Sequence, residues 1–176
     1  MTTDEYLYDT EETNRIRELA MGRMLEPPAP FFSHQAIALK IARIIGDHVD
    51  ALALGRVAIA PVDVVLDGER ALVLQPDVLF IATERLAIIR DQVWGPPDLV
   101  VEILSPGSEH YDRTQKLDWY RQYGVRECWL VEPRRQLVTV VDFTGAFPAT
   151  RTAGGVSAVD SSVLPQLAVT AATVFA

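Results

Sequence analysis

One carboxylate of this chain lies inside its most apolar run. Glu102 stands between Val101 and Ile103, in a stretch that Pro96-Pro97 precedes and Ser105-Pro106 follows. An apolar run bounded by such residues predicts a buried strand. Because an unpaired carboxylate is costly to bury, Glu102 must have a partner, bind a metal, or lie at an opening where chemistry takes place.

Asp98 belongs to the same predicted strand. Side chains of a strand alternate between its two faces, so Asp98 and Glu102 face the same way. Asp98 is nearer the start of the strand, directly after Pro97. We therefore expect Asp98 either to support a site around Glu102 or simply to cap the start of the strand.

Asp77 and Lys116 are the other candidates for chemistry. Asp77 follows Pro76, and a proline within an apolar run indicates a bend or an edge position. A solvated turn aspartate is the simpler interpretation of Asp77 taken alone. Lys116 lies in line with Asp112 on a predicted helix, where a surface ion pair is the simpler interpretation.

Together these side chains predict hydrolysis that uses a metal. If Asp77 and Glu102 converge at one end of a sheet, they attract a hard divalent cation, Mg²⁺ or Mn²⁺. Water bound to such a cation is acidic, and Lys116 would orient or deprotonate it, or stabilise the charge on a phosphodiester. We expect the tips of the three side chains to lie close enough together to share one metal ion, directly or through one water, which is about one metal–ligand diameter plus a water.

Hydrophobic spacing predicts the elements that must position these residues. A helix begins after Ser33 as N-cap, and a second helix ends at Gly124. The predicted elements are a short helical lead-in with little function (3–20), a strand (22–25), a helix (33–49), an antiparallel hairpin (57–66 and 71–81), a partly helical connection (83–93), a strand (98–104), a helix (109–123) and a second hairpin (125–132 and 137–143).

The three histidines carry less information. His34 falls at the start of the first long predicted helix, where free backbone amides and a partly positive dipole end lie. A capping or surface histidine is the simpler interpretation, and a role in the site is the alternative. His48 and His110 have spacings that match no local metal motif, so neither is expected to be a ligand.

Length and charge limit the possible classes of protein. The 176 residues suit one domain, and a net charge of -8 opposes nonspecific attraction to nucleic acid. The single cysteine, Cys128, excludes an internal disulfide and is expected to be a buried small hydrophobe. The N-terminus lacks the features of a secretory signal, and no apolar run approaches the roughly 20 residues that span a bilayer. We therefore expect a cytoplasmic protein with no membrane segment.

Several motifs, in this order and spacing, resemble the Uma family of putative restriction endonucleases, within the PD-(D/E)XK nuclease superfamily. The resemblance covers roughly residues 20–143 and matches the Pro-Asp aspartate of the superfamily to Asp77. The motifs are Gln75-Pro76-Asp77-Val78, the run 97–106, Asp112-Arg113, Lys116, Tyr120, Gly124-Val125 and Trp129-Leu130-Val131.

The resemblance also assigns the strand acid of the superfamily to Glu102. The superfamily's lysine normally stands two residues after that acid, but Leu104 occupies the position here, so Lys116 is expected to replace it from the following helix. Family members often carry a Gly-Glu pair near the first strand, whereas this chain has Gly22-Arg23. The accessory acid is therefore missing or is supplied by Glu26.

The resemblance implies one restriction-endonuclease-like domain over residues 1–176, of mixed α/β (α+β) class, with a central mixed β-sheet flanked by helices. It implies a Mg²⁺- or Mn²⁺-dependent endonuclease with DNA as substrate, in which Asp77, Glu102 and Lys116 are catalytic. His34 and Asp112 are further accessory candidates, and a homodimer is expected for an enzyme that cuts two strands.

Two other functions remain open from the sequence. A catalytically silent nuclease-fold module that binds partners or self-associates is favoured by the net charge of -8 and by the absence of an obvious basic, aromatic nucleic-acid surface. A metal-dependent hydrolase of another phosphorylated substrate would use the same residues.

Overall fold

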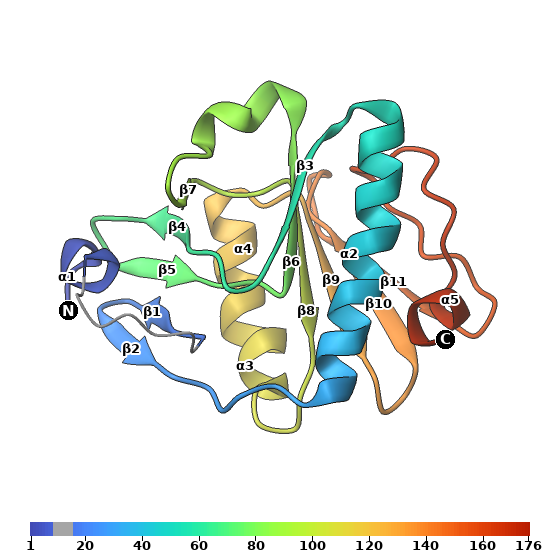
Figure 1. Ribbon diagram of the computed structural model, residues 1–176, viewed down its shortest axis with the longest axis horizontal. Helices are drawn as coiled ribbons and strands as arrows, with labels where there is room; N and C mark the ends of the chain where they lie inside the picture. The colour runs from blue at the N-terminus through green and yellow to red at the C-terminus, as the bar shows by residue number, and fades with distance from the viewer. Residues whose placement is uncertain (9–15) are drawn as a thin grey trace.

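The computed structural model describes residues 1–8 and 16–176 and contains two β-sheets (Figure 1). The larger sheet has the strand order β11-β10-β9-β8-β6-β3: β3 Gly55–Ile59, β6 Val78–Ala82, β8 Leu99–Ile103, β9 Glu127–Glu132, β10 Leu137–Asp142 and β11 Ala149–Gly154. The smaller sheet has the order β2-β1-β5-β4-β7: β1 Glu18–Ala20, β2 Arg23–Leu25, β4 Val64–Asp67, β5 Leu72–Leu74 and β7 Val93–Trp94.

The larger sheet is mixed, as predicted. Strand β8 pairs in parallel with β9 and antiparallel with β6. All five residues of β8 are buried, since both faces of this sheet are covered. This explains why the sequence of the strand is an almost continuous apolar run instead of an alternating one.

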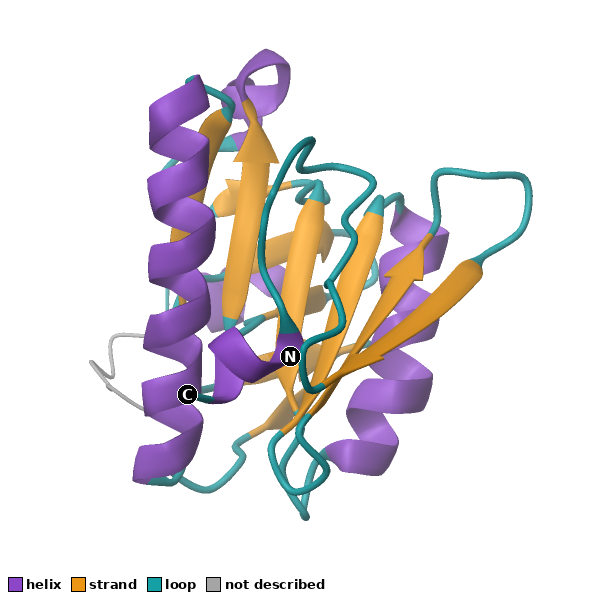
Figure 2. Ribbon diagram, turned by 90° about the vertical axis from the view of Figure 1, so that its right-hand side faces the viewer, coloured by secondary structure: helices purple, strands orange, loops and turns teal. Residues whose placement is uncertain are grey.

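Helices and the smaller sheet cover the two faces of the larger sheet (Figure 2). The long helix α2 (Phe32–Leu52) and the short C-terminal helix α5 (Ala171–Phe175) pack on one face. The smaller sheet and a second helical stretch pack on the other. That stretch comprises α3 (Glu109–Tyr111), the π-helical segment η2 (Asp112–Lys116) and α4 (Leu117–Tyr123).

Several expected elements are confirmed. The two long helices, the 98–104 strand and the 125–132/137–143 hairpin are present within a few residues of their predicted bounds. Gly124 ends α4 with a φ of 94°, the left-handed conformation that favours glycine. The connection predicted as partly helical contains the 3₁₀ helix η1 (Thr83–Ile88). Cys128 is fully buried. Among the described residues, no helix is long and apolar enough to cross a bilayer.

Other expectations are corrected. The lead-in is helical only over α1 (Thr3–Leu7) and becomes strand β1 at 18–20, while residues 9–15 lie outside the described part. The N-cap of α2 is Phe31 rather than Ser33, and no side chain caps it. The runs 57–66 and 71–81 are antiparallel but are divided between the sheets: β3 pairs with β6, and β4 with β5.

Candidate active site

The candidate site lies at the carboxyl end of β8. Glu102 is near that end, and the antiparallel pairing of Val78 with Val101 places Asp77, the residue before β6, beside it. The backbone amide of Ile103 donates to Asp77 Oδ2 at 2.7 Å. The bend at Pro76 therefore does what the sequence indicated: it turns Asp77 out of one strand and onto the end of its neighbour.

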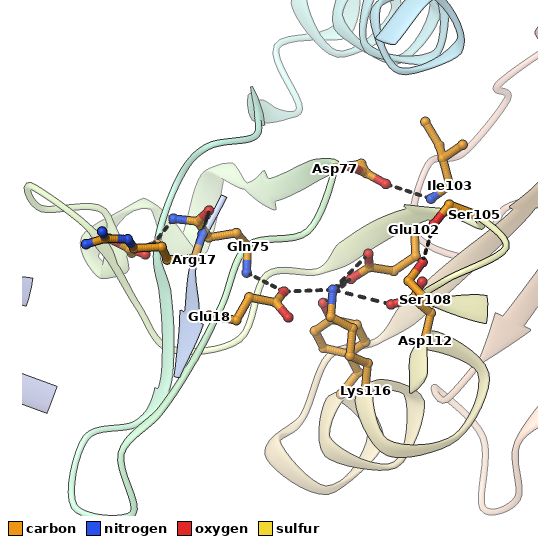
Figure 3. Close-up of polar contacts among 12 residues, drawn as sticks. Arg17, Glu18, Gln75, Asp77, Glu102, Ile103, Ser105, Ser108, Asp112 and Lys116 are labelled. Atoms are coloured by element: carbon orange, nitrogen blue, oxygen red, sulfur yellow. Dashed lines mark hydrogen bonds and ion pairs between the residues drawn. The ribbon is translucent and has the colours of Figure 1, made fainter. Parts of the chain in front are cut away.

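Lys116 reaches Glu102 from the helical stretch that follows β8 (Figure 3). Its Nζ lies 3.0 Å from Oε1 and 3.1 Å from Oε2 of Glu102, and both side chains are buried. Lys116 also lies 3.6 Å from Asp112, at the other end of η2. A π-helical segment widens one helical turn, and such segments occur frequently at functional sites. Here both charged ends of the segment are buried in the site.

Glu18 is a fourth carboxylate that the sequence analysis did not identify. Its Oε1 lies 2.7 Å from Lys116 Nζ and accepts the backbone amide of Gln75 at 3.1 Å. The expectation that residues 3–20 have little to do with the site is therefore wrong. No local pattern identified Glu18. In the structure, Met21 and Gly22 have positive φ and form the two-residue turn between β1 and β2, which makes Glu18 a strand residue.

His34 extends the site on the side of α2. Its Nε2 lies 2.9 Å from Asp77 Oδ1, so both carboxylate oxygens of Asp77 have partners. His34 is thus a neighbour of the site and does not cap the helix. His48 instead lies 2.9 Å from the carbonyl oxygen of Pro165, on the far part of α2.

The structure places the other two accessory candidates elsewhere. Asp98 shares a strand face with Glu102 but lies at the opposite end of β8, where it is 3.0 Å from Arg85 and 3.3 Å from Arg126. It also accepts the backbone amide of Ala82 at 2.8 Å. These contacts tie loops together and bring no group toward Glu102.

Glu26 also makes its contact away from Lys116. It forms an ion pair of 2.7 Å with Arg17. Glu18, and not Glu26, is the carboxylate of this region that contacts Lys116.

Crowding of the carboxylates changes their proton affinities. Burial raises the pKa of Glu102 well above its ordinary value; Lys116 opposes the rise, and the charges of Asp112 and Asp77 add to it. Burial also raises the pKa of Asp112. Burial alone lowers the pKa of Lys116, but the carboxylates of Glu102, Glu18 and Asp112 raise it well above the ordinary value. Lys116 is therefore an ammonium ion at neutral pH.

Two tyrosines complete the surroundings. The Tyr120 hydroxyl donates to Glu102 Oε1, and burial raises the pKa of Tyr120 well above its ordinary value. The hydroxyl of Tyr111 is buried without a hydrogen-bond partner, and Lys116 Nζ lies 5.9 Å from the centre of its ring. Buried polar groups are normally hydrogen-bonded. The unpaired hydroxyl beside this cluster thus leaves one polar group available to a bound molecule or ion.

The side chains at this site are of the chemical type that binds a divalent cation. The carboxylates of Glu18, Glu102 and Asp112 lie within ion-pair distance of the single ammonium group of Lys116, and Asp77 lies beside Glu102, so the site holds more hard carboxylate oxygen donors than cationic groups. In the part of the chain that the structure describes, no three His, Cys, Asp or Glu side chains are already arranged around a metal position. Lys116 stands among the carboxylates instead.

The expected convergence is therefore met in part. Glu102 and Lys116 are in direct contact, whereas Asp77 joins them through the amide of Ile103, next to Glu102. Asp77 lies at the same end of the sheet as Glu102, not on the opposite side.

Comparisons with known proteins give the family and the fold of the chain. The model of the Uma2 family, described as "putative restriction endonuclease", matches residues 3–172. Among solved structures, the chain resembles that of a putative nuclease belonging to DUF820 from Anabaena variabilis, with a TM-score of 0.83 and 21% sequence identity. The alignment covers 99% of this chain and 97% of that one. No curated protein matches the chain.

Proposed function

Because the chain belongs to the Uma2 family of putative restriction endonucleases, we propose that it is a metal-dependent endonuclease that hydrolyses phosphodiester bonds in DNA. One observation carries the proposal: Lys116, buried at the carboxyl end of β8, lies within ion-pair distance of Glu18, Glu102 and Asp112. Asp77 lies at the same strand end. Acids that bind a cation, together with a cationic side chain that acts on phosphate, suit metal-dependent phosphodiester hydrolysis.

The residues divide the work between them. Asp77 and Glu102 would hold Mg²⁺ or Mn²⁺, which supplies an acidic water and neutralises charge on the phosphate. Lys116 is protonated, so we assign it the stabilisation of negative charge on the phosphate and not the removal of a proton. Glu18 and Asp112 orient Lys116, and His34 orients Asp77.

Cleavage assays test the proposal directly. Supercoiled, linear and single-stranded DNA are incubated with the protein in Mg²⁺, in Mn²⁺ and in EDTA. We expect cleavage only with metal, and a loss of about 100-fold or more in rate for Glu102→Gln or Asp77→Asn. Asp118→Asn is the matched control, since Asp118 is an exposed carboxylate of the same helical stretch. Full activity of Glu102→Gln would remove the central residue of the proposal.

We also propose that the active form is a homodimer, because two copies supply one site for each of the two strands where a duplex is opened. Size-exclusion chromatography with light scattering measures the mass in solution. A monomer of 19.5 kDa that cuts both strands would contradict this part of the proposal.

A second function is favoured by a separate observation. Lys116 already neutralises part of the carboxylate charge, and the described residues contain no preformed group of three metal ligands. Both features suit a catalytically silent module with the nuclease fold. Thermal unfolding distinguishes the two, because a cation that binds only the native state raises Tm as its concentration rises. Absence of any shift with Mg²⁺ or Mn²⁺ would favour the silent module.

A further inference from the structure

Two consecutive aromatic side chains are exposed next to the candidate site. Phe31 and Phe32 are 72% and 89% exposed at the start of α2. His34, two residues further along, lies 2.9 Å from Asp77. The aromatic pair therefore lies on the β6 side of Glu102. Large exposed aromatic side chains lose the benefit of burial, so a pair of them beside a polar site indicates contact with a ligand.

Two exposed arginines, Arg134 and Arg135, lie on the other side of Glu102, and Arg135 is 3.5 Å from Glu132. Strand β9 runs parallel to β8, so both carboxyl ends lie at the same edge of the sheet, and Arg134-Arg135 form the turn from β9 to β10. Arg113, in the π-helical segment η2, lies 2.7 Å from Glu132 at the end of β9, which fixes this turn beside the helical stretch that carries Lys116. Figure 1 shows the start of α2, the loop after β8 and the β9–β10 turn along one edge of the molecule.

The charge of the molecule limits how a nucleic acid could be held there. The net charge of the chain is -8 and the site itself contains four carboxylates, and both oppose the attraction of phosphates. Stacking of bases on aromatic rings does not depend on charge and is worth about 1–3 kcal/mol per base. It requires bases that are not paired and stacked within a duplex.

We infer that the substrate is single-stranded or unpaired nucleic acid, with one base stacked on the Phe31-Phe32 pair and a neighbouring phosphate bound by Arg134 and Arg135. The inference rests on the proposed nuclease function and specifies its substrate class. Strand β8, with Glu102 at its end, lies between β6 and β9. A nucleic acid that contacts both the phenylalanine pair and the arginine pair therefore passes over the candidate catalytic residues. The aromatic and basic groups that the sequence left separate are thus brought to one edge by the fold.

Binding without cleavage tests the inference. Fluorescence anisotropy in EDTA measures the affinity for a labelled single strand of about 12 nucleotides, within the range of single-strand site sizes, and for the duplex of the same length. We expect tighter binding to the single strand. The double variant Phe31→Ala/Phe32→Ala should weaken single-strand binding about ten-fold and duplex binding little. Phe147→Ala is the matched control, since Phe147 is 83% exposed in the β10–β11 connection.

The arginines have a separate readout. Replacing Arg134 and Arg135 by Ala should reduce the slope of log affinity against log salt by about 0.7, because the two arginines bind one phosphate and each phosphate bound in a single strand contributes about 0.7. Arg70→Ala, in the β4–β5 turn, should leave the slope unchanged.

The outcomes separate this inference from the proposed function. Metal-dependent cleavage together with equal binding of single strand and duplex, or with unchanged binding by the phenylalanine variant, would overturn the inference and leave the nuclease intact. A change of oligomeric mass in the phenylalanine variant, with binding unchanged, would assign the pair to contact between copies of the chain and would also overturn it. Preferential single-strand binding without any cleavage would support the inference while the proposed hydrolysis failed.

Discussion

The ammonium group of Lys116 lies 2.7 Å from Glu18, 3.0 Å from Glu102 and 3.6 Å from Asp112. It therefore occupies the centre of the charge that a metal would neutralise. A cation that binds to these carboxylates must share them with Lys116 or displace it. The same side chain can thus favour the fold without metal and oppose metal binding.

The substitution Lys116→Met separates these two effects. Without metal it should destabilise the protein by about 3–5 kcal/mol, because the buried carboxylates lose their counter-ion. Mn²⁺ should then raise Tm more in the variant than in the wild type, since the cation replaces the missing charge. Thermal unfolding at a series of Mn²⁺ concentrations measures both.

Lys40→Met is the control, because Lys40 is the other lysine of the sequence and lies on α2. If Lys116→Met does not fold without metal, refolding at increasing Mn²⁺ gives the same readout. A smaller Mn²⁺ response in Lys116→Met than in the wild type would show that the lysine helps to hold the cation.

Glu102 predicts a dependence of stability on pH. Its pKa is raised in the folded state, chiefly by burial, above the ordinary value of 4.5. A raised pKa contributes stability below the ordinary value, and this contribution is lost as pH rises through the folded-state value. Relative to Glu102→Gln, the metal-free wild type should therefore lose stability as pH rises above about 4.5.

Thermal unfolding of both proteins between about pH 5 and pH 9 measures this difference. Glu102→Gln should be as stable as the wild type or more stable at neutral pH, because Lys116 retains Glu18 and Asp112 while one buried charge is removed. The difference isolates Glu102, since the raised pKa of Asp112 affects both proteins. A variant that is less stable than the wild type at every pH would identify Glu102 as a structural residue.

Part of the site was visible in the sequence because its residues break local rules. Glu102 stands in an apolar run, and Asp77 follows a proline bend. Glu18 breaks no such rule. It reaches Lys116 only because β1 pairs with β5, which brings Glu18 next to Gln75, 57 positions further along the chain. Contacts between elements so distant in sequence are set by sheet pairing, which a local pattern does not specify.

At the scale of elements, the helical stretch from Glu109 to Tyr123 combines three kinds of backbone. Hydrophobic spacing predicted one helix, and its ends agree with the structure. The π-helical segment from Asp112 to Lys116 was not predicted, because one extra residue in a turn hardly changes the spacing over a short helix. The segment matters because both of its charged ends belong to the site.

Two glycines allow the effect of a Gly→Ala substitution on stability to be compared between the end of one helix and the interior of another. Gly124 ends α4 with positive φ, and an added Cβ would also lie 3.7 Å from Pro96. Gly124→Ala should cost about 1–2 kcal/mol of unfolding free energy. Gly46 lies within α2 with nothing near its added Cβ, so Gly46→Ala should stabilise the protein by about 1 kcal/mol. Denaturant unfolding measures both, and equal effects of the two substitutions would contradict the assignment of the αL cap.

At the scale of the whole molecule, the C-terminal segment completes the core. Val159, Leu164, Val169 and Val174 are buried against the α2 face of the larger sheet. Glu127, fully buried in β9, accepts hydrogen bonds from the hydroxyl of Ser161 at 2.7 Å and the amide of Ser162 at 2.6 Å.

A chain that ends at Gly155 should therefore lose cooperative unfolding, because the apolar face and the carboxylate of Glu127 would both be exposed. Thermal unfolding followed by circular dichroism measures the transition. Val156→Ser in the full-length chain is the control, since Val156 is exposed. A cooperative transition in the shortened chain with the wild-type Tm would show that the segment is dispensable.

The family resemblance implied the mixed sheet and its helices, but it covered roughly residues 20–143 and did not place this C-terminal segment. Strand β11 was missed because four of its six residues are exposed, which is the polar composition of an edge strand. The apolar residues after it are spread over a loop with little regular structure. They are buried because they pack against the apolar face of the larger sheet, and their own spacing in the sequence follows no helix or strand period.

The burial of Cys128 gives the protein a kinetic probe of its own. Cys128 is the single cysteine of the chain. It is paired with Val100 of β8, two residues before Glu102 on the same strand. A thiol reagent reacts only with an exposed thiolate, and burial raises the pKa of Cys128 well above its ordinary value. The alkylation rate of the native protein therefore measures how often the central sheet opens enough to expose Cys128. Any ligand that closes the site above it should slow that rate in proportion to its occupancy.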